Sequence, residues 1–378
     1  MALVLSEEQQ LLKDSAEGFL AEKAPVSQLR ALRDNRDEVG YSKELWVEMS
    51  EMGFAGLLVD EDNGGVNFGV VGAGIVAEAM GKTLSASPYL SSAVIAASVI
   101  EAAGSDEQKS DLLPQIASGE KIVTLAIDEG AHHNPDKIAL KAIKTDSGYT
   151  LSGLKTFVCD GHVADTIIVA ARTSGEAGES GGVSLFLVEK GASGLIVDRT
   201  VMTDSRNWAK VTFESVTVSS DAMLGAADEG LSLIEPALDR ARIIVAAELL
   251  GVAQECLDQT VKYLQERKQF GVLIGTFQGL QHRAAHLFSE IELTRSAVLK
   301  AMQMADTGGD IRWFASLAKA KASKTAELAT NEAIQMHGGI GMTDEFDIGF
   351  YIKRARILQQ FLGDSNFHTD RFATCSSY

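Results

Sequence analysis

The chain has 378 residues, of which 46% are hydrophobic and 23% charged, with a formal net charge of −18. This length indicates two or three domains that share interfaces, and the acidic balance argues against a nucleic-acid partner, whose phosphates need a basic face. No apolar run approaches the ~20 residues of a membrane span, and three scattered cysteines, Cys159, Cys256 and Cys375, indicate neither a disulfide framework nor a metal site.

Helices are predicted for the first 121 residues. Ser6, followed three residues later by Gln9, forms a capping box that opens a helix over residues 6–22 and argues against a signal peptide. A cytoplasmic protein is therefore expected. Apolar spacing predicts further helices at residues 43–52, 70–80, 91–103 and 106–117, and the Ala- and Gly-rich stretch 70–80 suits close helix packing.

Short β-prone runs begin at residue 122 and recur at intervals of roughly ten residues, as in an all-β unit. They cover residues 122–127, 138–143, 149–151, 156–159, 166–171, 183–188, 196–201 and 211–218. Turn signals, Asp146-Ser147-Gly148 and Asp160-Gly161, lie between runs. The pattern predicts a small sandwich or barrel.

The helical period returns at residue 229 and continues almost to the end. Four long periodic stretches, residues 231–264, 276–304, 311–336 and 347–361, have lengths that suit a helix bundle. The expected fold is α+β. It comprises an N-terminal helical domain (1–121), a middle β-barrel or sandwich domain (122–228) and a C-terminal four-helix bundle (229–378).

Two segments of the last domain carry residues suited to a phosphate-bearing cofactor. Arg267-Lys268-Gln269-Phe270-Gly271 fits either a helix C-terminus with a glycine cap or a guanidinium that binds a pyrophosphate while Phe270 packs on a ring. Gln335-Met336-His337-Gly338-Gly339-Ile340-Gly341 fits either a flexible connection or a turn whose backbone N–H groups approach a ligand closely.

Taken together with Phe277-Gln278, these segments resemble the acyl-CoA dehydrogenase family, and the resemblance covers the whole chain. It implies the same three-domain order, a tetramer, and FAD bound between the β domain of one subunit and the bundle of a neighbour. The positions that the resemblance assigns to FAD contacts from the neighbouring subunit are Arg267, Gln269, Phe270, Ile274, Phe277, Gln278, Gln335, Gly338 and Gly339.

The β domain departs further from the family pattern. A Thr-Glu-Pro-Gly-Ala-Gly-Ser-Asp loop normally touches the flavin and the thioester, and residues 127–136 of this chain, which include Asp128, replace it. Phe157 and Cys159 stand where the family has a Trp and a Thr or Ser against the isoalloxazine. The resemblance makes Cys159 a small residue near the flavin, and a half-buried strand thiol is the alternative.

The family's catalytic base is absent at both of its usual positions. The resemblance places a Glu at residue 362 or 241, where this chain has Leu362 and Ala241. Arg242 is retained and is a candidate catalytic residue. Neither Leu nor Ala accepts a proton, and losing a general base costs roughly 10²–10⁴-fold in rate. Glu248 is a candidate base about two turns along the same helix face, or else a buried structural carboxylate. Asp364 and His368 are weaker candidates.

The resemblance implies α,β-desaturation of an acyl-CoA thioester in fatty-acid β-oxidation, with hydride transfer to flavin N5 and electrons passed to an electron-transfer flavoprotein. The chain looks most similar to the small subunit of two-component enzymes of the pimeloyl-CoA dehydrogenase type, which pairs with a large subunit. The assembly is thus expected to be a homo- or hetero-tetramer. Two alternatives remain: a non-catalytic subunit that contributes FAD contacts to its partner, and a flavin monooxygenase of the same fold.

Overall fold

The computed structural model describes residues 3–179 and 181–376 and divides the chain into two compact units. The first unit comprises Met1–Ala31, Val70–Ser85 and Arg242–Tyr378, and the second comprises Leu32–Gly69 and Ala86–Ala241. The helix α7 (Gly230–Glu266) has residues in both units. The predicted domain boundaries, after residues 121 and 228, remain predictions.

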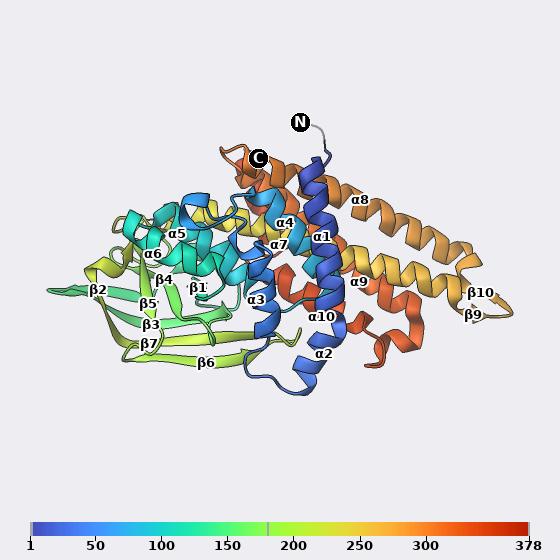
Figure 1. The fold of residues 1–378 in the computed structure, drawn as a ribbon, viewed down its shortest axis with the longest axis horizontal. Coiled ribbons are helices and arrows are strands. Elements are labelled where there is room, and N and C mark those ends of the chain that lie inside the picture. The colour runs from blue at the N-terminus through green and yellow to red at the C-terminus, as the bar shows by residue number, and fades with distance from the viewer. Residues whose placement is uncertain (1–2, 180, 377–378) are drawn as a thin grey trace. The chain divides into compact units, whose positions relative to one another are not determined.

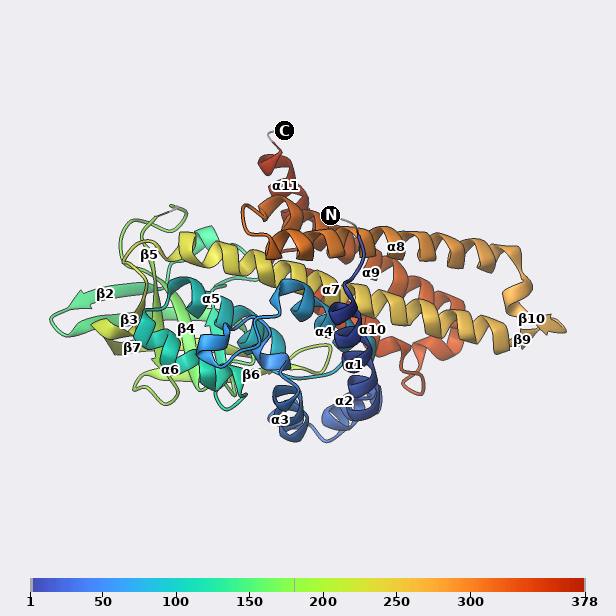
Figure 2. The same ribbon diagram turned by 45° about the horizontal axis from the view of Figure 1, so that its top comes forward.

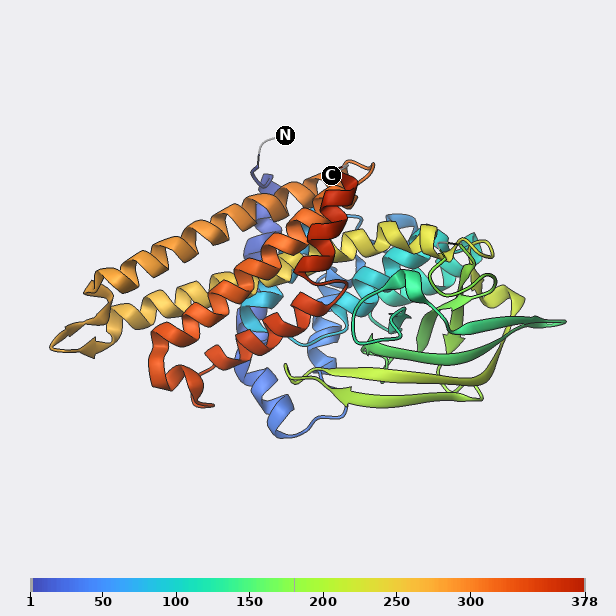
Figure 3. The ribbon, with the colours of Figure 1, turned by 180° about the vertical axis from the view of Figure 1, so that it is seen from behind.

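The first unit is helical (Figure 1). Besides most of α7, its helices are α1 (Glu7–Lys23), α2 (Val26–Asp34), α4 (Gly69–Thr83), α8 (Gln278–Asp306), α9 (Arg312–His337), α10 (Ile348–Gln360) and α11 (Ser365–Cys375). The capping box is confirmed, because Ser6 Oγ accepts from the Gln9 N–H and the Gln9 side chain accepts from the Ser6 N–H. Helices α8, α10 and α11 pack against α9, as Figure 3 shows from behind.

Glycines allow α4 and α7 to cross closely. A Cβ on Gly81 would lie 2.2 Å from the Glu248 carbonyl oxygen, and one on Gly251 would lie 1.9 Å from the Glu78 carbonyl oxygen. No larger residue fits at either place, since real Cβ atoms do not approach backbone this closely. The close packing predicted for residues 70–80 is therefore confirmed.

The second unit contains a mainly antiparallel sheet with helices α3 (Lys43–Glu51), α5 (Ala97–Ala103) and α6 (Asp106–Ala117). Its strands are β1 (Val123–Ala126), β2 (Lys141–Thr145), β3 (Gly148–Cys159), β4 (Thr166–Arg172), β5 (Val183–Glu189), β6 (Leu195–Val201), β7 (Asn207–Ser219) and β8 (Met223–Leu224). The order is β6-β7-β3-β2-β4-β5-β8, and β1 pairs with β4 in parallel.

The structure corrects several predicted elements. Residues 149–151 and 156–159 belong to one strand, β3, whose register against β7 shifts twice. Gly153 within it is required by packing, because a Cβ there would lie 2.9 Å from Leu140. Strand β2 begins at Lys141 instead of residue 138. Residues 89–96 form a π-helix before α5, and α2 and α11 were not predicted.

Within the described part of the chain, none of the helices combines the length and the apolar character that crossing a membrane requires.

Candidate functional site

A short hairpin joins α7 to α8 (Figure 2). Its two-residue loop is Phe270-Gly271, because Gln269 pairs with Val272. Its strands are β9 (Lys268–Gln269) and β10 (Val272–Leu273), and the Ile274 N–H donates to the Arg267 carbonyl at 2.9 Å. Phe270 and Gly271 have φ angles of +53° and +80°, the signs of a type I′ turn. Phe270 is 90% exposed, which is unusual for a phenylalanine, and its left-handed backbone is unfavourable for any residue with a Cβ.

The glycine-rich turn follows the end of α9. Gly338 has φ +66° and ψ −141°, which only glycine adopts readily. Gly341 is required by packing, because a Cβ there would lie 2.9 Å from the Ile334 carbonyl oxygen. Gly339 meets neither condition: its φ is not positive, and a Cβ on it would have no neighbour within 4 Å. The fold therefore does not explain why residue 339 is glycine.

The hairpin and the glycine-rich turn line one pocket of about 450 Å³, which we call the clamp pocket. Eight of the nine positions that the resemblance assigns to neighbouring-subunit FAD contacts line it; the ninth, Gln278, is the first residue of α8, next to the lining residue Phe277. The full lining is Tyr263, Arg267, Gln269, Phe270, Ile274, Phe277, Leu280, Arg283, Gln335, Met336, His337, Gly338, Gly339 and Ile340. Two segments about 70 residues apart in sequence thus build one site.

The clamp pocket has the charge that an anionic ligand requires. Arg283 is neutralised by Glu332, whereas the Arg267 guanidinium has no acidic or hydrogen-bonding partner among the described residues. The side-chain amides of Gln269 and Gln335 supply further donors and acceptors. An uncompensated guanidinium, two amides and an open glycine backbone fit a pyrophosphate, and the exposed Phe270 ring fits a stacked base. The residues present are therefore compatible with FAD.

His337 is a pocket residue that sequence reasoning missed. Its Nδ1 donates to the Ala333 carbonyl at 2.7 Å, and burial lowers its pKa, so the ring is neutral and Nε2 carries the lone pair. Within the described residues, Nε2 is buried without a hydrogen-bond partner. The ring stacks on Tyr263 with centroids 4.5 Å apart. Its place inside the glycine-rich segment was the available signal.

Three predicted cofactor contacts, Asp128, Phe157 and Cys159, lie in the second unit. Both Asp128 carboxylate oxygens are 3.0 Å from His133 Nδ1, which closes the loop that replaces the family pattern. Phe157 is 43% exposed, with φ +51°, at the second register shift of β3. The half-buried Cys159 thiol lies 3.5 Å from Asp160, whose pKa is raised by burial.

Both usual positions of the base are buried and apolar. Ala241 is fully buried in α7 and Leu362 is 2% exposed. Glu248 Oε1 accepts from Arg354 Nε and Nη2, each at 2.7 Å, in a buried ion pair between α7 and α10. Such a pairing is expected if Glu248 is a buried structural carboxylate, the alternative to its being a base. Asp364 caps α11, accepting from the N–H groups of Asn366 and Phe367.

Arg242 and His368 both contact the backbone of the turn before α11. Arg242 Nε donates to the Leu362 carbonyl at 3.3 Å, and His368 Nε2 donates to the same oxygen at 3.0 Å. Neither residue lines the clamp pocket.

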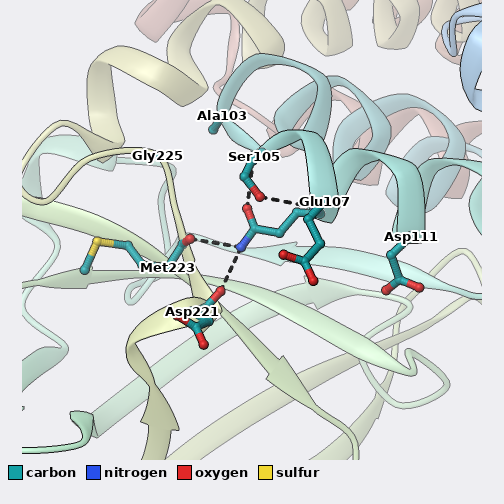
Figure 4. A pocket seen from close by; sticks show the side chains of 9 residues that line it. Ala103, Ser105, Glu107, Asp111, Asp221, Met223 and Gly225 are labelled. Carbon is teal, nitrogen blue, oxygen red and sulfur yellow. Dashed lines mark hydrogen bonds between the residues drawn. The ribbon is translucent and has the colours of Figure 1, made fainter.

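A larger pocket of about 700 Å³ lies in the second unit (Figure 4). Glu107, Asp111 and Asp221 line it, and the Gln108 side chain donates to the Asp221 and Met223 carbonyl oxygens. None of the predicted site residues belongs to this pocket. Its acidic lining disfavours the phosphates of FAD or coenzyme A.

Comparison with known proteins identifies the family of this chain. The profiles for the N-terminal, middle and C-terminal domains of acyl-CoA dehydrogenase match residues 6–120, 127–216 and 228–374. The mitochondrial short/branched chain specific acyl-CoA dehydrogenase of Bos taurus is 30% identical over 379 residues, which cover 98% of this chain and 86% of that protein.

Solved structures extend the comparison. Butyryl-CoA dehydrogenase from Megasphaera elsdenii superposes with a TM-score of 0.91 at 28% identity and full coverage (100%) of both chains. A chain of the ChsE4–ChsE5 complex from Mycobacterium tuberculosis superposes with a TM-score of 0.89 at 25% identity, covering 100% of this chain and 99% of that one. The three domain profiles match this chain in order, and the chain is 30% identical to a known family member. This chain therefore belongs to the acyl-CoA dehydrogenase family.

Proposed function

We propose that this chain binds FAD through the clamp pocket, as one side of a flavin site that an adjacent chain completes. FAD-dependent oxidation of acyl-CoA thioesters is typical of the family. The observation that carries the proposal is Arg267, a cation with no partner among the residues the structure describes, beside Gly339, a glycine the fold does not require. Arg267 would neutralise the pyrophosphate, and Gly339 would leave room for it.

The proposed reaction is α,β-desaturation of an acyl-CoA. When bound, the flavin supplies the acceptor for a hydride from the substrate β-carbon, and the α-proton must pass to a base. Leu362 and Ala241 cannot take that proton, and both side chains are buried and apolar. An electron-transfer flavoprotein is the proposed acceptor of the electrons.

A second candidate is a non-catalytic subunit of a hetero-oligomeric dehydrogenase, such as the small subunit of the pimeloyl-CoA dehydrogenase type. The loss of both usual carboxylates favours it, and so does the similarity to a chain of the two-component ChsE4–ChsE5 complex. In that assembly this chain would hold FAD in the clamp pocket, and the partner would supply the base. The tetrameric assembly and the cytoplasmic location stay predictions.

The test is purification of the chain alone and with a co-expressed large subunit, followed by flavin absorbance and dehydrogenation assays. Flavin and turnover in the chain alone would support the first candidate. Flavin or turnover that depends on the co-expressed partner would support the second. Protein that stays colourless in both preparations, even after incubation with FAD, would overturn the proposal.

A further inference from the structure

The turn between α10 and α11 holds a non-glycine residue in a left-handed conformation. Leu362 has φ +59°, and Gly363 has φ +107°. A Cβ on Gly363 would lie 2.4 Å from the Phe367 ring and 2.9 Å from His368 Nε2, so this turn packs tightly on α11. A left-handed leucine is unfavourable and persists only when its surroundings determine it, which is most common at functional sites.

Three buried side chains donate hydrogen bonds to the carbonyl oxygens of this turn, and the first is Lys319 of α9. Its side chain is fully buried, and Nζ donates to the Gln359 and Gly363 carbonyl oxygens at 3.2 and 2.9 Å. Burial, followed by the nearby Arg242, lowers the pKa of Lys319 to about 7, and Asp364 opposes this shift. A buried lysine whose acceptors are backbone carbonyls serves to fix that backbone.

Arg242 and His368 complete the set from two other helices, and both are fully buried. Their Nε and Nε2 atoms converge on the Leu362 carbonyl oxygen. Because a carbonyl can only accept, His368 carries its proton on Nε2. Three helices therefore each direct one nitrogen donor at the carbonyls of a single turn. We call this arrangement the turn cradle: Arg242, Lys319 and His368 around residues 359–363.

We infer that Lys319 and His368 are positioning residues that give the side chain at position 362 one fixed direction. On the proposed function, a carboxylate introduced at position 362 would be held in that same direction. In this chain the cradle holds Leu362, a side chain that cannot accept a proton. The link from position 362 to a base rests on the proposed function, whereas the cradle itself does not.

The first experiment measures the cradle by amide hydrogen exchange of the full chain. Lys319→Met and His368→Leu should speed exchange at residues 359–364 by about tenfold or more, because each removes a donor to the turn. Lys321→Met is the matched control on the same helix, since Lys321 pairs with Glu290 instead. His368→Gln, which keeps a donor, should restore slow exchange. Equal exchange in Lys319→Met and Lys321→Met would overturn the inference.

The second experiment uses a readout that a purely structural role would not move. Leu362→Glu should exchange the substrate α-proton with deuterium from solvent: the α-C–H bond breaks, the carboxylate takes the proton, and a deuteron returns to carbon. Leu362→Gln should show none. Adding Lys319→Met to Leu362→Glu should lower the exchange at least tenfold at equal FAD content, while Lys321→Met should not.

The outcomes separate the two claims. If Leu362→Glu folds and binds acyl-CoA but exchanges no proton, or if it unfolds while Leu362→Gln folds, the inference is wrong. If no variant, nor the unmodified chain with any partner, binds acyl-CoA, the proposed function is wrong. In that case the amide exchange still decides whether Lys319 and His368 position the turn.

Discussion

Single residues show which parts of the site serve the fold and which serve a ligand. Gly338 and Gly341 are glycines for conformational and packing reasons, whereas Gly339 has neither reason. The glycine-rich run is visible in the sequence, but the sequence alone does not show which of these glycines the conformation, the packing or a ligand requires. The separation needs backbone angles and neighbours, which depend on where α9 ends.

Gly339→Ala should weaken FAD binding about tenfold or more without lowering the thermal midpoint of unfolding, because the added methyl group enters only the clamp pocket. Isothermal titration with FAD and thermal unfolding of the FAD-free protein would measure both effects. The matched control is Gly349→Ala in α10, another glycine with open space around its Cβ position but outside the pocket. Equal FAD affinities in the two variants would contradict the assignment.

His368 gives a prediction for acid stability. Burial, then Lys319 and Arg242, lowers its pKa from 6.5 to about 2 in the folded protein. Below pH 6.5 the unfolded chain binds a proton that the folded chain does not, so stability is lost as the pH falls, at about 1.4 kcal/mol per unit. Between pH 6.5 and 5, the free energy of unfolding should fall more steeply in the unmodified chain than in His368→Gln. If the free energy of unfolding falls equally with pH in the two proteins, the buried, neutral state of His368 is contradicted.

At the scale of elements, sequence pattern was reliable where one period dominates. The capping box at Ser6 and the long amphipathic stretches gave α1, α7, α8, α9 and α10 nearly to the residue. Strand β3 was divided in two, because bulges interrupt the alternation of buried side chains. Helix α11 was not predicted, although Asp364 is an N-cap that could have signalled it. The cradle was invisible because its donors come from three helices.

The loop of the β9–β10 hairpin departs from the residue preference of its turn type. A type I′ turn favours Asn-Gly, and this chain has Phe270-Gly271. Phe270→Asn should relieve strain, so the thermal midpoint of the FAD-free protein should not fall. The affinity for FAD should nevertheless fall about tenfold, which corresponds to about 1.4 kcal/mol, because the ring is lost from the pocket wall. A variant that binds FAD normally would show that the exposed ring serves another purpose.

The ion pair between α7 and α10 tests the two roles of Glu248. Glu248→Met or Arg354→Met alone should cost about 3–5 kcal/mol of unfolding free energy, because each removes one member of a buried ion pair. The double variant should recover most of that loss, as chemical denaturation would show. If Glu248 is structural, the recovered double variant keeps its flavin content and turnover in the assembled enzyme. Recovered stability with lost α-proton removal would instead identify Glu248 as the base.

At the scale of the whole molecule, the clamp pocket is only one side of a dinucleotide site. Its lining comes from a single unit and leaves Phe270 exposed. FAD content should therefore fall when the assembly is diluted to monomers. Light scattering coupled to flavin fluorescence would follow both quantities. A monomer that retains FAD would contradict a site shared between chains.

Arg267 has a practical consequence for handling the protein. In a chain with a formal net charge of −18, a guanidinium that has no acidic partner within the described residues attracts small polyanions locally. Phosphate and pyrophosphate buffers should occupy it and delay cofactor uptake, while a chloride buffer of the same ionic strength should not. Preparations purified in different salts could thus differ in colour although the polypeptide is the same.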